Sequence, residues 1–274
     1  MSVVLLLLLG VTATFALSGL FDDPEPATEP AADEDFSEIC CSEFEDCAEI
    51  DEIIMGDDGD DYFCGCSSSG PAATIDGGGG NDTLDANFSN NIVLRGGDGD
   101  DVLISRGTSY QGTNYFIDMD GGAGDDRLIQ QVDLFSIWFR SDGGELDNYG
   151  SRMTGGAGAD QFEIAMIERE PLYPMTEDMN LIDAATIRDF EAGIDTIIVD
   201  LSGLSGHVAE SAYMIERNIS DGTDTEIWIR MIAVSPDISV PYCDILITVS
   251  NTSGLSWDNV AFVGGGAPTL TGMA

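Results

Sequence analysis

The stretch GGDGDDVL at residues 96–103 decides the fold of this chain. Four more stretches share its spacing of glycine, aspartate and a large apolar residue. They are GDDGDDYF at 56–63, GGGGNDTL at 77–84, GGAGDDRL at 121–128 and GGAGADQF at 155–162. All of them fit the repeat G-G-x-G-x-D-x-U, in which U is large and apolar. Copies that keep these residues in phase predict an all-β architecture in which the same turn recurs.

Each position of the repeat has a physical role. Glycine lets the backbone adopt positive φ, so carbonyl oxygens can turn toward one point. The aspartate at position six adds a hard anionic oxygen, which suits Ca²⁺. The residue at position eight begins a short strand and is expected to point inward. The position-six residues are Asp61, Asp82, Asp101, Asp126 and Asp160, and the position-eight residues are Phe63, Leu84, Leu103, Leu128 and Phe162.

These repeats resemble those of the RTX (repeats-in-toxin, hemolysin-type calcium-binding repeat) proteins, which Gram-negative bacteria export. The resemblance covers residues 53–200 and includes ATIRDFEAGIDTIIVD at 185–200, which is similar to the segment that often follows the last repeat. It implies a parallel β-roll with several Ca²⁺ ions between successive loops, held by position-six aspartates and backbone carbonyls. The carbonyl donors assigned by this resemblance belong to Gly56, Asp58, Gly77, Gly79, Gly96, Asp98, Gly121, Ala123, Gly155 and Ala157.

The spacing of the loops predicts how they stack. They begin at residues 56, 77, 96, 121 and 155, so each is separated from the next by 21, 19, 25 and 34 residues. The first two separations suit one full coil of two nonapeptides. We therefore expect the loops along one edge of the roll, with degenerate turns such as 86–91 at the other. The longer gaps indicate inserted loops and leave the pairing of the fourth loop with the fifth open.

Composition restricts the function. The net charge is −42, and the nine basic residues are all arginine, so no nucleic-acid partner is expected. The single histidine, His207, is expected in a surface loop, and neither an H-E-x-x-H nor a G-x-S-x-G motif is present. We therefore expect a non-enzymatic protein that folds on binding calcium, with a surface or matrix partner that the sequence does not identify. A secreted hydrolase or toxin with an active site in 166–274 is the alternative.

The N-terminal part predicts export. Residues 2–21 are uncharged and mostly apolar, which suits a membrane anchor or a cleaved signal peptide with Ala16–Leu17–Ser18 near the cleavage site. Residues 22–52 form an acidic, proline-containing spacer. Both alternatives for the apolar segment place the rest of the chain outside the cytoplasm, as a secreted or cell-surface protein of a Gram-negative bacterium.

Six cysteines accompany this export-like start. Disulfides are favoured over a zinc cluster because the thiols lack C-x₂-C spacing, and we expect them to staple the N-terminal end of the roll. The candidates are Cys40, Cys41, Cys47, Cys64, Cys66 and Cys243.

The last part of the chain is expected to be β-rich. Two strands at 212–217 and 226–232 flank a turn at 221–224, and two more are expected at 244–249 and 260–263. We predict the roll at 53–165 and, at 166–274, a small sheet that caps it. The family resemblance also implies a secretion signal within this C-terminal part.

Overall fold

The structure is a computed structural model that describes most of the chain after residue 52. The described residues are 53–64, 73–86, 92–106, 117–134, 151–168, 181–219, 222–234, 242–252 and 254–271. They belong to one compact unit, residues 40–274. The predicted apolar segment and acidic spacer lie outside them. Within these ranges, no helix is long and apolar enough to span a bilayer.

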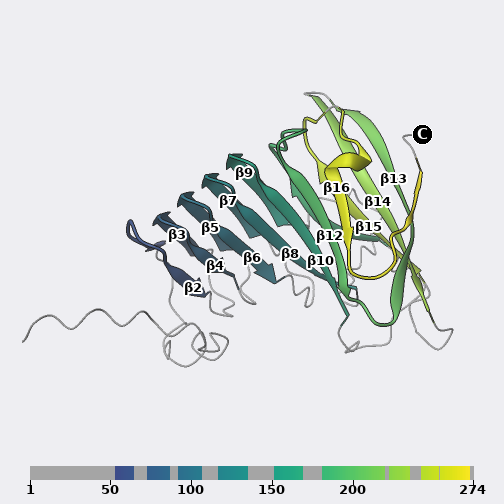
Figure 1. Ribbon diagram of the computed structural model, residues 1–274, viewed down its shortest axis with the longest axis horizontal. Coiled ribbons are helices and arrows are strands. Elements are labelled where there is room, and N and C mark those ends of the chain that lie inside the picture. Colours follow the sequence, from purple (N-terminus) through teal and green to yellow (C-terminus); the bar gives the residue numbers. More distant parts are fainter. Residues whose placement is uncertain are drawn as a thin grey trace, which may run out of the picture. The chain divides into compact units, whose positions relative to one another are not determined.

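Strands alternate between two sheets as the chain advances (Figure 1). One set leads into the glycine loops: β1 (Ile53–Met55), β3 (Ala73–Gly79), β5 (Ile92–Asp98), β7 (Ile117–Ala123), β9 (Ser151–Ala157) and β11 (Leu181–Ile187). The other set leads out of them: β2 (Tyr62–Cys64), β4 (Thr83–Asp85), β6 (Val102–Arg106), β8 (Arg127–Asp133), β10 (Gln161–Ile167) and β12 (Thr196–Gly203). Each pair of strands with its loop makes one coil, and all pairing between coils is parallel. The predicted parallel β-roll is confirmed.

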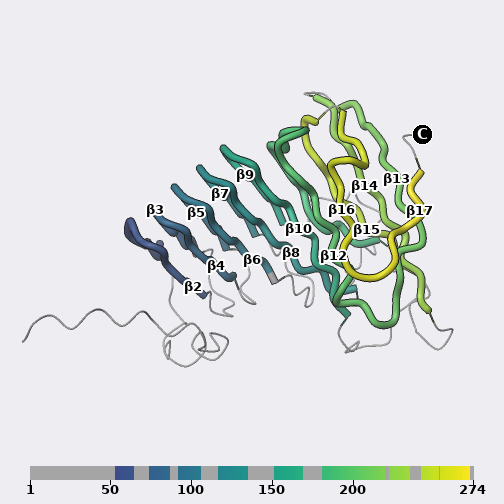
Figure 2. Tube along the Cα trace, viewed as in Figure 1, coloured from purple at the N-terminus to yellow at the C-terminus, as the bar shows by residue number. Residues whose placement is uncertain are grey.

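The glycine loops lie at one edge of the roll, as the spacing predicts (Figure 2). Gly78, Gly97, Gly122 and Gly156 are register partners in succession. The fourth and fifth loops therefore pair in register despite the 34 residues between them. The extra residues lie between β8 and β9, where the chain passes from an outgoing strand to the next incoming one. The glycine loops keep the same geometry because the extra residues are inserted at the opposite connection, between an outgoing strand and the next incoming strand.

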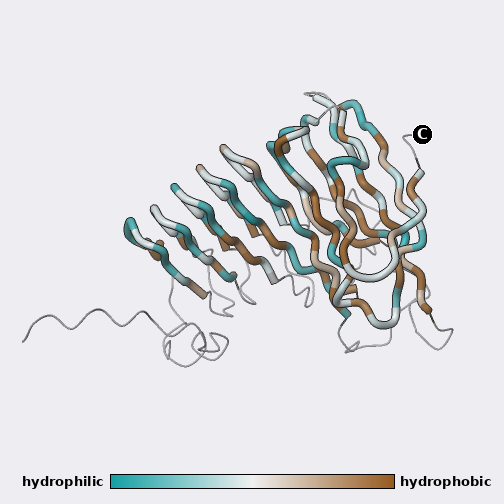
Figure 3. Tube along the Cα trace, viewed as in Figure 1, coloured by the Kyte–Doolittle hydropathy of each residue, from teal (hydrophilic) through white to brown (hydrophobic). Residues whose placement is uncertain are grey.

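Two rows of apolar side chains fill the space between the sheets, and the strands are the most hydrophobic part of each coil (Figure 3). The predicted position-eight residues make one row, and the structure confirms that they point inward: Leu84, Leu103, Leu128 and Phe162 are 0% exposed. The facing row is Ile75, Leu94, Met119, Met153 and Ile187. Burial of each such side chain contributes about 1.5–3 kcal/mol. The rows give each coil the same inward-facing register.

The roll continues beyond the boundary predicted at residue 165, which falls within β10. β11 and β12 form one further coil, and β16 (Val260–Val263) pairs in parallel with β12. The remaining strands extend the sheet of β11 and make no separate small sheet. They are β15 (Tyr242–Val249), β14 (Gly222–Ala233), β13 (His207–Ile219) and β17 (Thr269–Thr271), in that order.

The predicted hairpin of β13 and β14 is present, but its turn is displaced. Ile219 pairs with Gly222, so Gly222, Thr223 and Asp224 belong to β14. The predicted turn at 221–224 is wrong in that respect. The strands predicted at 244–249 and 260–263 correspond to β15 and β16. β15 pairs with β11 in parallel, and antiparallel pairing begins only with β14 and β13, so the edge of β11 is covered by another strand and not left open.

Close stacking of the loops predicts a large penalty at Gly97. Its φ is +118°, and a Cβ there would lie 2.1 Å from the Gly78 carbonyl oxygen. We expect Gly97→Ala to destabilise the calcium-loaded roll by more than about 3 kcal/mol, because the clash adds to the backbone strain. Gly193→Ala is the matched control, since its φ is +87° with nothing within 4 Å. Thermal unfolding at saturating calcium measures both, and equal losses would show that close approach is unimportant.

Candidate metal-binding edge

The position-six aspartates form a continuous hydrogen-bonded ladder along the loop edge. The carboxylate oxygen Oδ1 of each accepts the main-chain N–H of the position-six residue in the preceding loop. Asp61 N donates to Asp82 at 2.7 Å, Asp82 N to Asp101 at 2.7 Å, Asp101 N to Asp126 at 2.8 Å and Asp126 N to Asp160 at 2.9 Å. The structure thus brings all five predicted aspartates into one line.

The second carboxylate oxygen of the inner aspartates has no protein partner. Oδ2 of Asp82, Asp101 and Asp126 is buried without a hydrogen bond. An unsatisfied buried anionic oxygen is costly, so each marks a place where a cation would be stabilising.

A main-chain carbonyl lies beside each of these orphaned oxygens. A Cβ built on Gly96 would meet Oδ2 of Asp101 at 2.1 Å and the carbonyl oxygen of Gly121 at 2.4 Å. The same arrangement recurs at Gly77, with Asp82 and Gly96, and at Gly121, with Asp126 and Gly155. Position-one glycine is therefore required because a side chain would fill the space where the two oxygens converge. The position-one carbonyls of Gly77, Gly96, Gly121 and Gly155 lie beside the aspartates.

The carbonyls assigned to position three have a different environment. Those of Asp98, Ala123 and Ala157 each accept the position-four N–H of the preceding loop, at 2.8, 2.8 and 2.9 Å. These bonds hold adjacent loops together on the outer side of the edge. The position-one carbonyls and the carboxylates are therefore the oxygens most directly available to a cation.

Burial shifts the acidity of the ladder. Burial raises the pKa of Asp101 to about 6 and that of Asp126 to about 7. The main-chain N–H that each carboxylate accepts lowers the pKa, and the neighbouring carboxylates raise it. Burial also raises the pKa of Asp82 and Asp160. Each pKa unit corresponds to about 1.4 kcal/mol. An ionised metal-free ladder therefore opposes folding.

Arginine does not neutralise this row in the described part of the chain. Five described arginines pair instead with acids outside this row, and three of these pairs lie between neighbouring strands of the roll or beside them. Arg127 lies 2.5 Å from Glu163, Arg188 lies 3.3 Å from Asp118, and Arg95 lies 3.9 Å from Asp76. The ionised aspartates of neighbouring loops therefore repel each other. Neighbouring strands are about 4.8 Å apart, and two like unit charges at that separation repel by about 3 kcal/mol at an effective dielectric constant of 20.

The donor set fits a hard cation that accepts backbone ligands. No group of three or more His, Cys, Asp or Glu side chains is gathered for a metal within the described ranges. A cation at this edge would therefore be held by carboxylate oxygens together with main-chain carbonyls, all of them oxygen. Ca²⁺ takes six to eight such ligands in flexible geometry, whereas zinc prefers nitrogen and sulfur.

A second ladder, which the sequence did not predict, runs along position five. Asp60, Asn81, Asp100 and Asp125 each accept the N–H of position five in the following loop, at 2.8–3.0 Å. This exposed ladder points in the opposite direction to the buried one and ends at Ala159. The recurrence of Asp or Asn at position five was the available signal.

The sequence also missed a sixth member of the buried ladder. Oδ1 of Asp195 accepts Asp160 N at 3.0 Å, and Phe162 is the register partner of Ile197. The segment FEAGIDTI at 190–197 retains glycine at position four, aspartate at position six and an apolar residue at position eight. It lacks the two leading glycines, which is why the repeat pattern did not select it.

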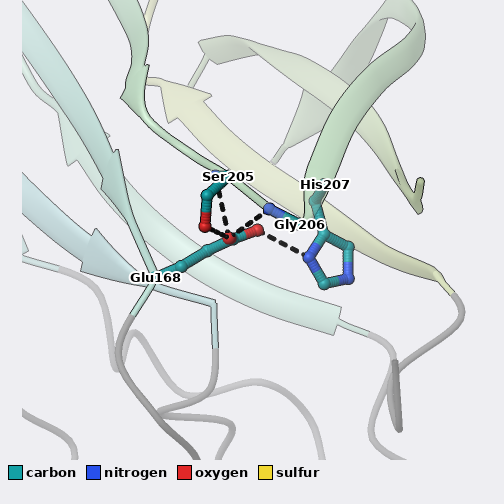
Figure 4. Close-up of polar contacts among 4 residues, drawn as sticks. All are labelled: Glu168, Ser205, Gly206 and His207. Atoms are coloured by element: carbon teal, nitrogen blue, oxygen red, sulfur yellow. Dashed lines mark hydrogen bonds and ion pairs between the residues drawn. The ribbon is translucent and has the colours of Figure 1, made fainter. Parts of the chain in front are cut away.

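The predicted surface position of His207 is wrong. Its side chain is 0% exposed, and its Nδ1 lies 2.7 Å from Oε1 of Glu168 (Figure 4). The other oxygen of Glu168 accepts hydrogen bonds from Ser205 Oγ and from the N–H groups of Ser205 and Gly206. Burial by itself raises the pKa of Glu168, but these bonds outweigh it and lower the pKa. Histidine and serine thus both bond to one buried carboxylate, which joins the end of β10 to the start of β13.

The cysteine predictions meet the structure at two positions. Cys243 is a free thiol with 0% exposure, and burial, with the charges of Asp244 and Glu168, raises its pKa to about 12. Its predicted part in a disulfide is wrong because the side chain points into the core between the sheets. Cys64 lies at the end of β2. Cys40, Cys41, Cys47 and Cys66 are outside the described residues.

Comparison with known proteins adds a structural likeness. No family model and no curated protein matches the sequence. Solved structures that are similar include the solution structure of the AlgE6R2 subunit from the Azotobacter vinelandii mannuronan C5-epimerase. It has 20% sequence identity and a TM-score of 0.25, over 79% of this chain and 96% of that chain. The chain is a parallel β-roll. That assignment depends on its own strand pairing, since the likeness is too low to carry an argument.

Asp101 and Asp160 should contribute unequally to calcium binding. We expect Asp101→Ala to lose more calcium affinity than Asp160→Ala. Oδ2 of Asp101 lies beside the Gly121 carbonyl oxygen. In the fifth loop, by contrast, the three atoms nearest to a Cβ built on Gly155 all belong to Asp160, so no next-loop carbonyl lies beside its carboxylate. Calorimetric titration with calcium measures both. Equal losses, or the reverse order, would contradict this assignment.

The ladder also predicts how pH acts on the roll. The folded-state pKa values of Asp101 and Asp126 lie above the usual 3.8, so the metal-free fold binds more protons than the unfolded chain. Its stability should therefore fall as pH rises from about 4 to 7. Since calcium must displace those protons, we expect weaker calcium binding at pH 5.5 than at pH 7.5, with proton release. Calorimetry in buffers of different ionisation enthalpy measures that release, and its absence would contradict the prediction.

Proposed function

We propose that this chain is a calcium-binding repeat protein of the RTX kind, whose roll folds when several Ca²⁺ ions bind between its loops. One observation carries the proposal: three buried carboxylate oxygens, on Asp82, Asp101 and Asp126, lie unpaired in line, and each has a main-chain carbonyl beside it. Apolar packing does not remove the cost of these charges, and arginine does not reach them in the described residues. Bound calcium neutralises them and supplies the missing partners.

The mechanism is a folding equilibrium coupled to calcium. Where free calcium is scarce, repulsion and desolvation of the aspartates oppose stacking of the loops. Where calcium is abundant, a ligand that binds only the folded state stabilises it by RT ln(1 + [L]/Kd), about 2.7 kcal/mol per site at a hundredfold excess over Kd. Several sites along one edge would make the transition steep in calcium concentration.

The role that we propose is structural or adhesive and involves no catalysis. The only histidine of the chain is buried against Glu168, and the Ser205 hydroxyl donates to the same carboxylate. This arrangement supports a structural role for these residues, which join the end of β10 to the start of β13. The hydrolase alternative for 166–274 draws no support from it. The partner in this proposal is a cell-surface or matrix component.

We place the protein outside the cytoplasm, secreted or at the surface of a Gram-negative bacterium. The apolar segment 2–21, acting as a signal peptide or membrane tether, supports this location, as does the need for calcium. The net charge of −42 argues against binding to nucleic acid or anionic lipid. Recovery of the folded chain only from the cytoplasm would contradict the proposal.

Calcium removal tests the proposed function directly. We expect excess chelator to abolish most of the β signal of the roll in circular dichroism at pH 7.5, and millimolar calcium to restore it. Magnesium at the same concentration is the control, because its smaller shell demands near-octahedral geometry. An unchanged spectrum after chelation would refute calcium-dependent folding.

A further inference from the structure

The sixth loop of the roll, residues 189–197, keeps only half of the repeat geometry. Its outgoing half is in register, because Thr196 N donates to the carbonyl of Asp160 at 2.9 Å and Thr196 pairs with Gln161. Its incoming half departs, since β11 pairs with β9 over three residues and ends at Ile187. The interval between the fifth and sixth loops therefore differs from the others.

The carboxylate of Asp189 fills the place of main-chain carbonyls at this interval. Its two oxygens accept the N–H groups of Gly155 and Gly156, both at 2.9 Å. At the first loop, by contrast, Gly56 N donates to the main-chain carbonyl of Asp76 at 2.8 Å. A charged acceptor with two N–H donors is already stabilised by these hydrogen bonds.

The next-loop carbonyl oxygen that would help to hold a cation is not among the nearest atoms here. In the first four loops, a Cβ built on the position-one glycine would lie 2.0–2.7 Å from the position-one carbonyl oxygen of the next loop. At Gly155 the three nearest atoms all belong to Asp160. At both ends of the ladder the second oxygen of the aspartate accepts a main-chain N–H of its own loop, from Glu191 to Asp195 at 2.7 Å and from Asp57 to Asp61 at 3.0 Å, whereas the inner aspartates leave theirs unpaired.

A large side chain also replaces the glycine at position one. Phe190 is 6% exposed, and its ring lies 6.1 Å from that of Phe162. This packing extends the core to the loop edge, where every preceding coil has a glycine.

We propose that the interval between the fifth and sixth loops binds no ion, and that Asp189 and Asp195 close it by hydrogen bonds. The calcium capacity of the edge is then limited to the intervals between loops one and five. Asp189 and Asp195 are positioning residues that end the series. This inference rests on the proposed calcium function and identifies the loop interval at which calcium binding ends.

Counting ions in matched variants tests the inference. Native mass spectrometry of the full chain at saturating calcium compares Asp126→Asn, Asp189→Asn and Asp195→Asn with the wild type. We expect Asp126→Asn to lose at least one ion. The other two should keep the wild-type number but unfold at lower temperature, because they lose hydrogen bonds only. A folded Asp189→Asn or Asp195→Asn variant that binds fewer ions would overturn the proposal.

A crystal structure of the calcium-loaded wild type keeps the test decisive if those variants do not fold. Anomalous scattering should show peaks between loops one and five and none between loops five and six. A peak beside Asp160 and Asp195 in that last interval would overturn the inference. Absence of any peak along the edge would refute the proposed calcium function instead, so the two failures are distinguishable.

Discussion

A row of like charges, buried side by side, is the constraint on which this protein depends. Each position-six aspartate uses one oxygen to hold the preceding loop, so it cannot move away from its neighbours without losing a main-chain hydrogen bond. The same bond fixes the second oxygen in a buried place without a partner. Structure and instability thus arise from one residue type. In the proposed function a divalent cation resolves the conflict, because the oxygens coordinate it and its charge offsets their repulsion.

The apolar core supplies the register that makes this row regular. Leu84, Leu103 and Leu128 stack in one line between the sheets, and the loops must then repeat at the strand spacing. Insertions enter only where an outgoing strand leads to the next incoming strand, so they leave the loop edge unchanged. The apolar rows and the aspartate ladder therefore repeat with the same spacing, one residue of each in every coil.

The C-terminal end of the unit is built differently from the middle. At the C-terminal end the ladder finishes on Asp195, and the sheet of β11 continues through the parallel strand β15 to the antiparallel strands β14 and β13. The buried Glu168–His207 pair ties β10 to β13 across this transition. An ionised carboxylate with several donors gives a polar contact that is specific in position, which suits the junction between parallel and antiparallel pairing.

Local pattern determined the repeated part of this protein. Glycine, aspartate and apolar residue in phase were enough to predict the roll, the shared loop edge and the inward row that contains Leu103, because each rule acts within nine residues. Only the tertiary structure decided features that depend on residues far apart in sequence. The fourth and fifth loops pair across 34 residues, His207 is buried by Glu168, and Cys243 faces the core. Asp195 joined the ladder through register and not through its own loop sequence, since a neighbouring coil supplies the N–H that it accepts.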